Sequence, residues 1–293
     1  MATFRAPAAQ AAYIMKALQG HHLRSVGTVR NYEQGLTRVA EWTQRERLPG
    51  GLRAMTPELA IRYLEQRGQE VGQKALDMER QAMQAMMQHV TGQLAHGARI
   101  PVIKSEQAQV LMARAYTAPQ VALIAAAQTP RHGLATELAY AAGLRAHELL
   151  TLRRGEERAA DPRPALASKW QGRNGVIYTV HGKGGLVREV LLPHALAERL
   201  EAVRLDAPLA ITDRGIHYQS HYDIGGGQRW SNSVSAASER ALGWSTGAHG
   251  LRHSYAQERM AELQASLSRD AALTTVSQEM GHFRPEITET YLR

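Results

Sequence analysis

Apolar residues recur at steps of three and four positions through most of the first hundred residues, the spacing of one buried face on an α-helix. The clearest stripe consists of Val26, Val29, Tyr32, Leu36, Val39 and Trp42. A shorter alanine-rich run at 8–18, a run that begins at Thr56-Pro57-Glu58, and a longer one from Leu76 to Leu94 complete the pattern. The sequence therefore predicts a small four-helix bundle as an N-terminal domain over residues 1–98.

The helical periodicity breaks between 97 and 109, where basic residues flank Pro101. We assign residues 99–112 to an extended linker and 113–293 to a second domain. Thr117-Ala118-Pro119-Gln120 predicts the start of a helix in that domain, with Thr117 as its N-cap. The segments 155–164 and 216–228 are predicted to be loops, because one is charged and contains prolines and the other contains three consecutive glycines.

One stretch of the second domain reads as β-structure instead. Between residues 176 and 192, two runs rich in β-branched residues flank a glycine-containing turn, which predicts a hairpin with Lys183 at its tip. The chain has five lysines, so arginine supplies nearly all of its basic charge. A lysine at this tip suggests a group that can give up its proton, which arginine effectively cannot do. The fold class that follows is mainly α with a small antiparallel β-sheet.

The composition of the chain indicates which class of binding partner and which cellular compartment to expect. The chain has 293 residues, enough for two domains, and a formal net charge of +8, which favours a polyanionic partner and nucleic acid above all. There are no cysteines, so disulfides, thiolate metal sites and cysteine nucleophiles are excluded. No apolar run approaches a membrane span, and the first ten residues lack the apolar region of a signal peptide. We expect a cytoplasmic protein with no membrane partner.

The candidate chemistry lies near the end of the sequence, in His249-Gly-Leu-Arg252-His253, Met280-Gly-His282 and Tyr291. A tyrosine hydroxyl is a poor nucleophile at neutral pH and needs a base or cations beside it. Histidine is suited to take that proton, and a planar guanidinium matches two oxygens of a phosphoryl group. These residue types together are suited to attack and stabilise a phosphodiester without a metal.

A second arginine stands upstream. Arg145 follows a predicted helix end at Gly143 and starts the next helix, where free backbone N–H groups also favour an anion. Glu148, one turn further on, could hold the Arg145 side chain in place. Arg145 could equally have no role beyond this ion pair, and Lys183 could be an ordinary turn lysine.

Other interpretations of the histidines and the tyrosine must be weighed. His249 and His253 are four residues apart, as in a metal-binding pair on a helix, and a second pair in 216–228 repeats that spacing. Arg252 would place a fixed positive charge beside such a metal, and no carboxylate is close in sequence, so we expect no metal. His253 either supports the site or acts directly, and Tyr291 taken alone could be a half-buried aromatic residue.

Six of these residues follow the order and contexts of a known family: Arg145, Lys183, His249, Arg252, His282 and Tyr291. The sequence resembles the tyrosine recombinases, the phage integrase family, over roughly residues 116–293. The preceding helices are compatible with the N-terminal core-DNA-binding domain of that family, which closes round a duplex with the catalytic domain. The resemblance implies a mainly α catalytic domain with a three-stranded sheet that carries the hairpin lysine.

The resemblance also implies a reaction. Tyr291 would attack the scissile phosphate, expel a 5′-hydroxyl and form a 3′-phosphotyrosine bond, while Arg145 and Arg252 hold the non-bridging oxygens. Lys183 would protonate the leaving oxygen. No ATP, metal or other cofactor is implied, because the covalent bond conserves the phosphodiester energy.

His249 and His282 would position the phosphate and manage the tyrosine proton, with Glu148 and His253 as supporting residues. The partner implied is double-stranded DNA, held as two duplexes by a homotetramer, with accessory DNA-bending or directionality factors. We favour an integrase of a bacterial mobile element that acts in the cytoplasm on the nucleoid.

Three departures from the family and two rival functions remain. Arg252 and His282 are thirty residues apart, somewhat more than the family pattern, and Met280 stands where leucine is usual. Only Leu292 and Arg293 follow Tyr291. The C-terminal helix by which many family members dock on a neighbouring protomer is therefore not expected. The rivals are a type IB topoisomerase-like nicking-closing enzyme and a DNA-binding accessory protein that has lost catalysis.

Overall fold

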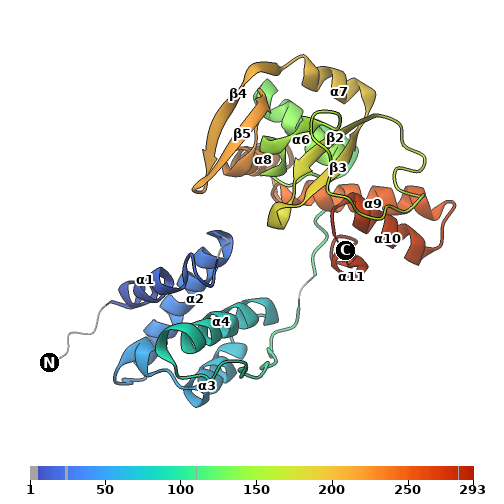
Figure 1. Ribbon diagram of the computed structural model, residues 1–293. Coiled ribbons are helices and arrows are strands. Elements are labelled where there is room, and N and C mark those ends of the chain that lie inside the picture. Colours follow the sequence, from blue (N-terminus) through green and yellow to red (C-terminus); the bar gives the residue numbers. More distant parts are fainter. Residues whose placement is uncertain (1–5, 24–25, 110, 283) are drawn as a thin grey trace. The chain divides into compact units, whose positions relative to one another are not determined.

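The computed structural model describes residues 6–23, 26–109, 111–282 and 284–293, and the chain folds into two compact units, Met1–Val110 and Leu111–Arg293 (Figure 1). The predicted bounds 1–98 and 99–112 include 1–5, 24–25 and 110, which lie outside the described residues. Much of the segment predicted as a linker packs on the first unit. Ile100 is in that unit's core, the Ser105 hydroxyl donates to the carbonyl of Val71, and the Gln107 side chain donates to the carbonyl of Gln69.

The described part of the first unit contains four α-helices and two short helical turns. Their bounds are α1 Pro7–Leu18, α2 Val26–Arg45, η1 Gly51–Ala54, α3 Pro57–Gly68, α4 Gln73–Met86 and η2 Met87–Thr91, the last a π-helical turn. The predicted helix start at Thr56 is confirmed, because its side chain accepts the backbone N–H of Leu59 and Pro57 occupies the first turn. In α2, the stripe residues Tyr32, Leu36, Val39 and Trp42 lie in the core, and Leu36 and Val39 are fully buried.

The second unit combines helices with two small antiparallel sheets. Its helices are α5 Ala118–Ala126, α6 Pro130–Ala142, η3 Glu148–Thr151, η4 Lys183–Gly185, α7 His194–Glu201, α8 Gly227–Leu242, α9 His249–Gln264, α10 Arg269–Glu279 and α11 Pro285–Glu289. Its strands are β1 Arg153–Arg154, β2 Val176–His181, β3 Val187–Leu192, β4 Arg204–Asp213 and β5 Ile216–Tyr222. In Figure 1 the β4–β5 ribbon lies at one side of the unit, and α9, α10 and α11 gather near the C-terminus.

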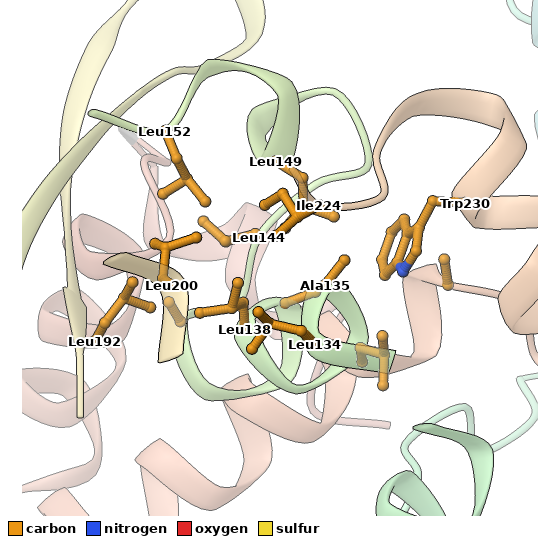
Figure 2. Packing of buried hydrophobic residues seen from close by; sticks show 14 of the residues in the cluster. Leu134, Ala135, Leu138, Leu144, Leu149, Leu152, Leu192, Leu200, Ile224 and Trp230 are labelled. Carbon is orange, nitrogen blue, oxygen red and sulfur yellow. The ribbon is translucent and has the colours of Figure 1, made fainter. Parts of the chain in front are cut away.

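The predicted hairpin and fold class are confirmed. β2 pairs with β3 from Val176↔Leu192 to His181↔Val187, β1 adds a third strand, and Lys183 lies in the turn. The core of this unit includes leucines of α6 and Trp230 of α8 (Figure 2). Thr117 caps α5 with a capping box to Gln120, as its sequence predicted.

The prediction of a loop over 216–228 is wrong for its first half. Ile216–Tyr222 forms β5 and pairs with β4, and only the residues that follow turn into α8. The buried Asp213 at the end of β4 accepts the backbone N–H of Gln228 at 2.8 Å, which ties this ribbon to the first turn of α8. Among the residues that the structure describes, no helix has the length and apolar character needed to cross a bilayer.

Candidate active site

Arg252 lies at the centre of a buried polar cluster. It is in the first turn of α9 and is fully buried. Its guanidinium donates to the carbonyl of Gly143, to the carbonyl of Met280 at 3.1 Å and to Nε2 of His282 at 3.1 Å. Its Nε–H has no hydrogen-bond partner within the described residues. Burial, and then the positive charge of Arg145, lower the pKa of Arg252 to about 10, so the side chain remains cationic at neutral pH.

Tyr291 packs in the middle of three histidines. Its ring centroid lies 5.2 Å from that of His249, 4.9 Å from that of His253 and 5.2 Å from that of His282. Cζ of Arg252 lies 5.5 Å from the same ring centroid, and Tyr291 is 8% exposed. The H-x-x-R-H, G-H and Tyr elements of the sequence therefore converge in space, although Tyr291 is 38 residues or more beyond the α9 residues that it contacts.

The surroundings favour neutral forms of these histidines. Burial, and then the charge of Arg252, lower the pKa of His282 to about 3, while burial and the charge of Arg114 lower the pKa of His253 to about 4. His249 is the exposed first residue of α9, and the protein that packs around its ring, followed by the charge of Arg252, also lowers its pKa. At neutral pH the three imidazoles can therefore accept protons or hydrogen bonds.

A carboxylate organises the upstream arginine. Gly143 ends α6 in the left-handed conformation, with φ of 58°, and the chain turns so that Glu148 reaches back to Arg145. The Glu148 carboxylate accepts the Arg145 backbone N–H at 2.8 Å and its Nη1 at 2.7 Å. Glu148 is fully buried, whereas the Arg145 side chain is 20% exposed, so Arg145 is held in place with part of its side chain open to solvent.

Arg188 is a member of this cluster that the sequence did not single out. It lies on β3, is 6% exposed, and donates to Glu148 through Nη2 at 2.7 Å and through Nε at 3.4 Å. Its Nη1 donates to the carbonyl of Glu279 at 2.7 Å, at the end of α10. A Cβ built on Gly281 would lie 2.5 Å from Cδ of Arg188, so only glycine allows this approach. Arg188 thus joins the hairpin, the Arg145 turn and the segment that carries His282.

A second buried carboxylate fixes the end of α10. Glu279 is fully buried and accepts the Tyr255 hydroxyl at 2.9 Å, the Trp170 backbone N–H at 3.0 Å and two nitrogens of Arg259. Each lone pair of the carboxylate therefore faces a donor, which makes burial of the charge tolerable. This network sets the position of the carbonyls of Glu279 and Met280, to which Arg188 and Arg252 donate.

Lys183 stands apart from these contacts. It is exposed on the short turn between β2 and β3, and within the described residues it makes no hydrogen bond or ion pair. The residue before it, Gly182, is close to the cluster, because a Cβ built there would lie 3.6 Å from Oε1 of Glu148. The turn of the hairpin therefore starts beside Glu148, and the exposed lysine follows directly. Within the described residues, there is no group of three or more His, Cys, Asp or Glu side chains that could bind a metal ion.

No protein-family model matches the sequence, and no curated protein matches it. Solved structures do match in fold. The XerH site-specific recombinase bound to palindromic difH substrate, in a post-cleavage complex, is 13% identical, with a TM-score of 0.60 over 98% of this chain and 90% of that one. A lambda integrase dimer bound to a COC′ core site is 16% identical, with a TM-score of 0.57 over 97% and 94% of the two chains. The Tn1549 transposon integrase with circular intermediate DNA is 11% identical, with a TM-score of 0.52 over 98% and 95%. The chain therefore has the fold of tyrosine recombinases, as its motifs led us to expect.

Proposed function

We propose that this protein is a site-specific tyrosine recombinase, which cuts and rejoins duplex DNA through a 3′-phosphotyrosine intermediate. The observation that carries the proposal is the position of Tyr291, whose ring lies about 5 Å from three neutral histidines and 5.5 Å from Cζ of the buried Arg252. A tyrosine among proton acceptors and beside a cation is the arrangement that activates a phenol towards phosphorus. The fold supports the same conclusion.

In the first step, Oη of Tyr291 forms a bond to phosphorus and the bond from phosphorus to the 5′-oxygen breaks. Arg145 and Arg252 hold the non-bridging oxygens, where charge accumulates. The unpartnered Nε–H of Arg252 supports this role, because a buried donor without an acceptor is unfavourable by about 1–3 kcal/mol until an acceptor such as a phosphate oxygen reaches it. Lys183 donates a proton to the leaving 5′-oxygen, and its place on an exposed hairpin turn lets it reach a bound duplex.

The tyrosine proton passes to a histidine. His249 and His282 are neutral in the free protein, because packing of protein around their rings and then the charge of Arg252 lower their pKa values. An arriving phosphate brings negative charge, which raises the pKa of both imidazoles and strengthens them as proton acceptors at the moment of attack. Glu148 and His253 support the site, the first by holding Arg145 and the second by packing 4.9 Å from Tyr291 between ring centroids.

Reversal of the first step by the 5′-hydroxyl of a second duplex gives strand exchange without ATP or a metal. We propose a homotetramer on two duplexes, assisted by DNA-bending or directionality factors, that integrates or excises a bacterial mobile element in the cytoplasm. The DNA-bound recombinases of similar fold, one of them a lambda integrase tetramer on a Holliday junction, support this assembly.

The test is a covalent trap. The protein is incubated with nicked suicide duplexes drawn from the ends of its own genetic element, and a denaturing gel is run with Tyr291→Phe and EDTA lanes. We expect an adduct at a 3′ end that survives EDTA and is absent from the Tyr291→Phe lane. A footprint without an adduct would instead indicate a DNA-binding accessory protein. Relaxation of plasmid without any attachment site would indicate a topoisomerase-like enzyme.

A further inference from the structure

Thr288 lies between the two groups that the proposed reaction must coordinate. It is in α11, is fully buried, and its Oγ1 lies 2.9 Å from Nδ1 of His282. Its carbonyl accepts the backbone N–H of Tyr291 at 2.9 Å. One buried residue therefore contacts the histidine ring through its side chain and the tyrosine through its main chain.

The hydrogen bonds around His282 determine where its proton lies. A guanidinium can only donate, so Nε2 of His282 must accept the N–H of Arg252 at 3.1 Å. A neutral imidazole has one protonated nitrogen, so Nδ1 carries the hydrogen and donates it to Oγ1 of Thr288. Arg252 and Thr288 therefore fix this tautomer together, Arg252 by donating to Nε2 and the Thr288 hydroxyl by accepting from Nδ1.

We propose that Thr288 is a positioning residue, which keeps Nε2 of His282 unprotonated and holds Tyr291 in register with it. The inference rests on the proposed function. With the tautomer fixed, Nε2 is the ring nitrogen of His282 that keeps a lone pair. That lone pair accepts the Arg252 N–H, so Nε2 can take a proton only when this hydrogen bond is released. Because Thr288 also binds the Tyr291 backbone, a displacement of the imidazole and a displacement of the nucleophile are coupled.

A side chain that only filled space would not need the hydroxyl. A buried hydroxyl is unfavourable unless it is hydrogen-bonded, and valine would fill the same volume without that requirement. In metal sites, an outer hydrogen bond to a ligating histidine orients the ring and sets its tautomer, and its loss typically costs roughly 10–100-fold in affinity or activity. We expect an effect of that order on strand cleavage.

The experiment uses the full-length protein with three substitutions. Thr288→Val keeps the shape and removes the hydroxyl, and Thr288→Ser keeps the hydroxyl and removes a methyl group. Thr290→Val is the matched control, because Thr290 lies in the same segment, is exposed, and donates to the carbonyl of Ile287 instead of contacting His282. DNA binding and single-turnover adduct formation are measured for each at saturating suicide duplex.

We expect Thr288→Val to slow adduct formation by roughly 10–100-fold with binding unchanged within about twofold. Thr288→Ser should stay within about threefold of the wild type, and Thr290→Val should match it. A wild-type cleavage rate for Thr288→Val would overturn the proposal, as would equal losses for the valine and serine variants, which would indicate packing alone.

A second measurement does not depend on cleavage. In protein labelled with ¹⁵N-histidine, the ring signals of His282, assigned with His282→Gln, report which nitrogen carries the hydrogen. The wild type and Thr288→Ser should show hydrogen on Nδ1, and Thr288→Val should lose that preference. An unchanged tautomer in Thr288→Val would refute the positioning role. If the wild type forms no adduct, the proposed function fails, and the ring signals alone decide whether Thr288 positions His282.

Discussion

Replacement of Glu148 should destabilise the second unit more than replacement of any surface carboxylate. Burial alone would raise the pKa of Glu148, but the charges of Arg188, Arg252 and Arg145 outweigh that effect and hold the pKa well below its ordinary value. Glu148→Ala would leave the buried Arg188 without its counter-charge. Removal of one partner from a buried ion pair lowers the free energy of unfolding by about 3–5 kcal/mol. Glu148→Gln keeps an acceptor oxygen and should fall between this variant and the wild type.

Urea unfolding followed by tryptophan fluorescence measures this loss. The second unit contains three of the four tryptophans: Trp170, Trp230 and Trp244. With a slope of roughly 2 kcal/mol per molar urea, a loss of about 3–5 kcal/mol lowers the midpoint by about 1.5–2.5 M. Glu137→Gln is the matched control, because Glu137 pairs with Arg199 on the surface, where an ion pair contributes about 0–1 kcal/mol.

The pH dependence gives an independent check with a defined sign. The pKa of Glu148 is lowered in the folded state, so its stabilising contribution is complete above the ordinary value of 4.5 and is lost as the pH falls towards the folded-state pKa. The stabilities of the wild type and Glu148→Gln should therefore converge in acid. A Glu148→Ala midpoint within about 0.5 M of the wild type at neutral pH would refute this account of the cluster.

Three further outcomes follow from the same geometry. The pKa of His253 is lowered to about 4, so as the pH falls the unfolded chain takes up a proton at this residue before the folded chain does. The free energy of unfolding should therefore fall from about pH 6.5 towards pH 4. His253→Asn should make this dependence on pH weaker in urea titrations. Gly143→Ala should lower the free energy of unfolding by about 2–4 kcal/mol, because its Cβ would lie 2.8 Å from Cδ1 of Tyr255 and its φ is 58°. Gly172→Ala, at a φ of 76° in open space, should lower it by only about 1–2 kcal/mol. Equal losses would mean that the overlap with Tyr255 is relieved. Lys183→Arg keeps the charge but not a transferable proton, so single-turnover cleavage should fall by about 10²–10⁴ while DNA binding stays constant; undiminished cleavage would remove Lys183 from the mechanism.

Local patterns in the sequence predicted the elements whose formation is itself local. The hairpin around Lys183 follows from two β-branched runs and a glycine turn, and the N-cap at Thr117 follows from its own tetrapeptide. The spacing H-x-x-R-H places three groups on the first turn of α9 whatever surrounds it. The association of Arg145 with these groups depends on tertiary packing, so it was expected only from a family resemblance.

Elements that depend on distant partners were missed. β5 alternates apolar and polar residues, but it is only stable against β4, whose Asp206 and Pro208 are poor strand formers and whose pairing shifts register between Arg204 and Leu209. Arg188 and Thr288 had little local signal. One is an arginine on a strand and the other a threonine in a five-residue helix, and their roles come from partners on other elements. A charged residue at an inward-facing position of β3 was the only available hint for Arg188.

The hydrogen bonds of the Arg252 cluster join parts of the chain that are far apart in sequence. Arg252 donates to Gly143, 109 residues earlier, and Arg188 donates to Glu279, 91 residues later. Contacts of this range form late in folding, because the chain between them must be ordered first. A polypeptide that is still emerging from the ribosome, or one whose second unit has opened, holds the same side chains but not their arrangement. Whatever reaction the cluster performs is thereby restricted to chains that have finished folding, so under the proposed function an incomplete molecule would leave the DNA strands intact.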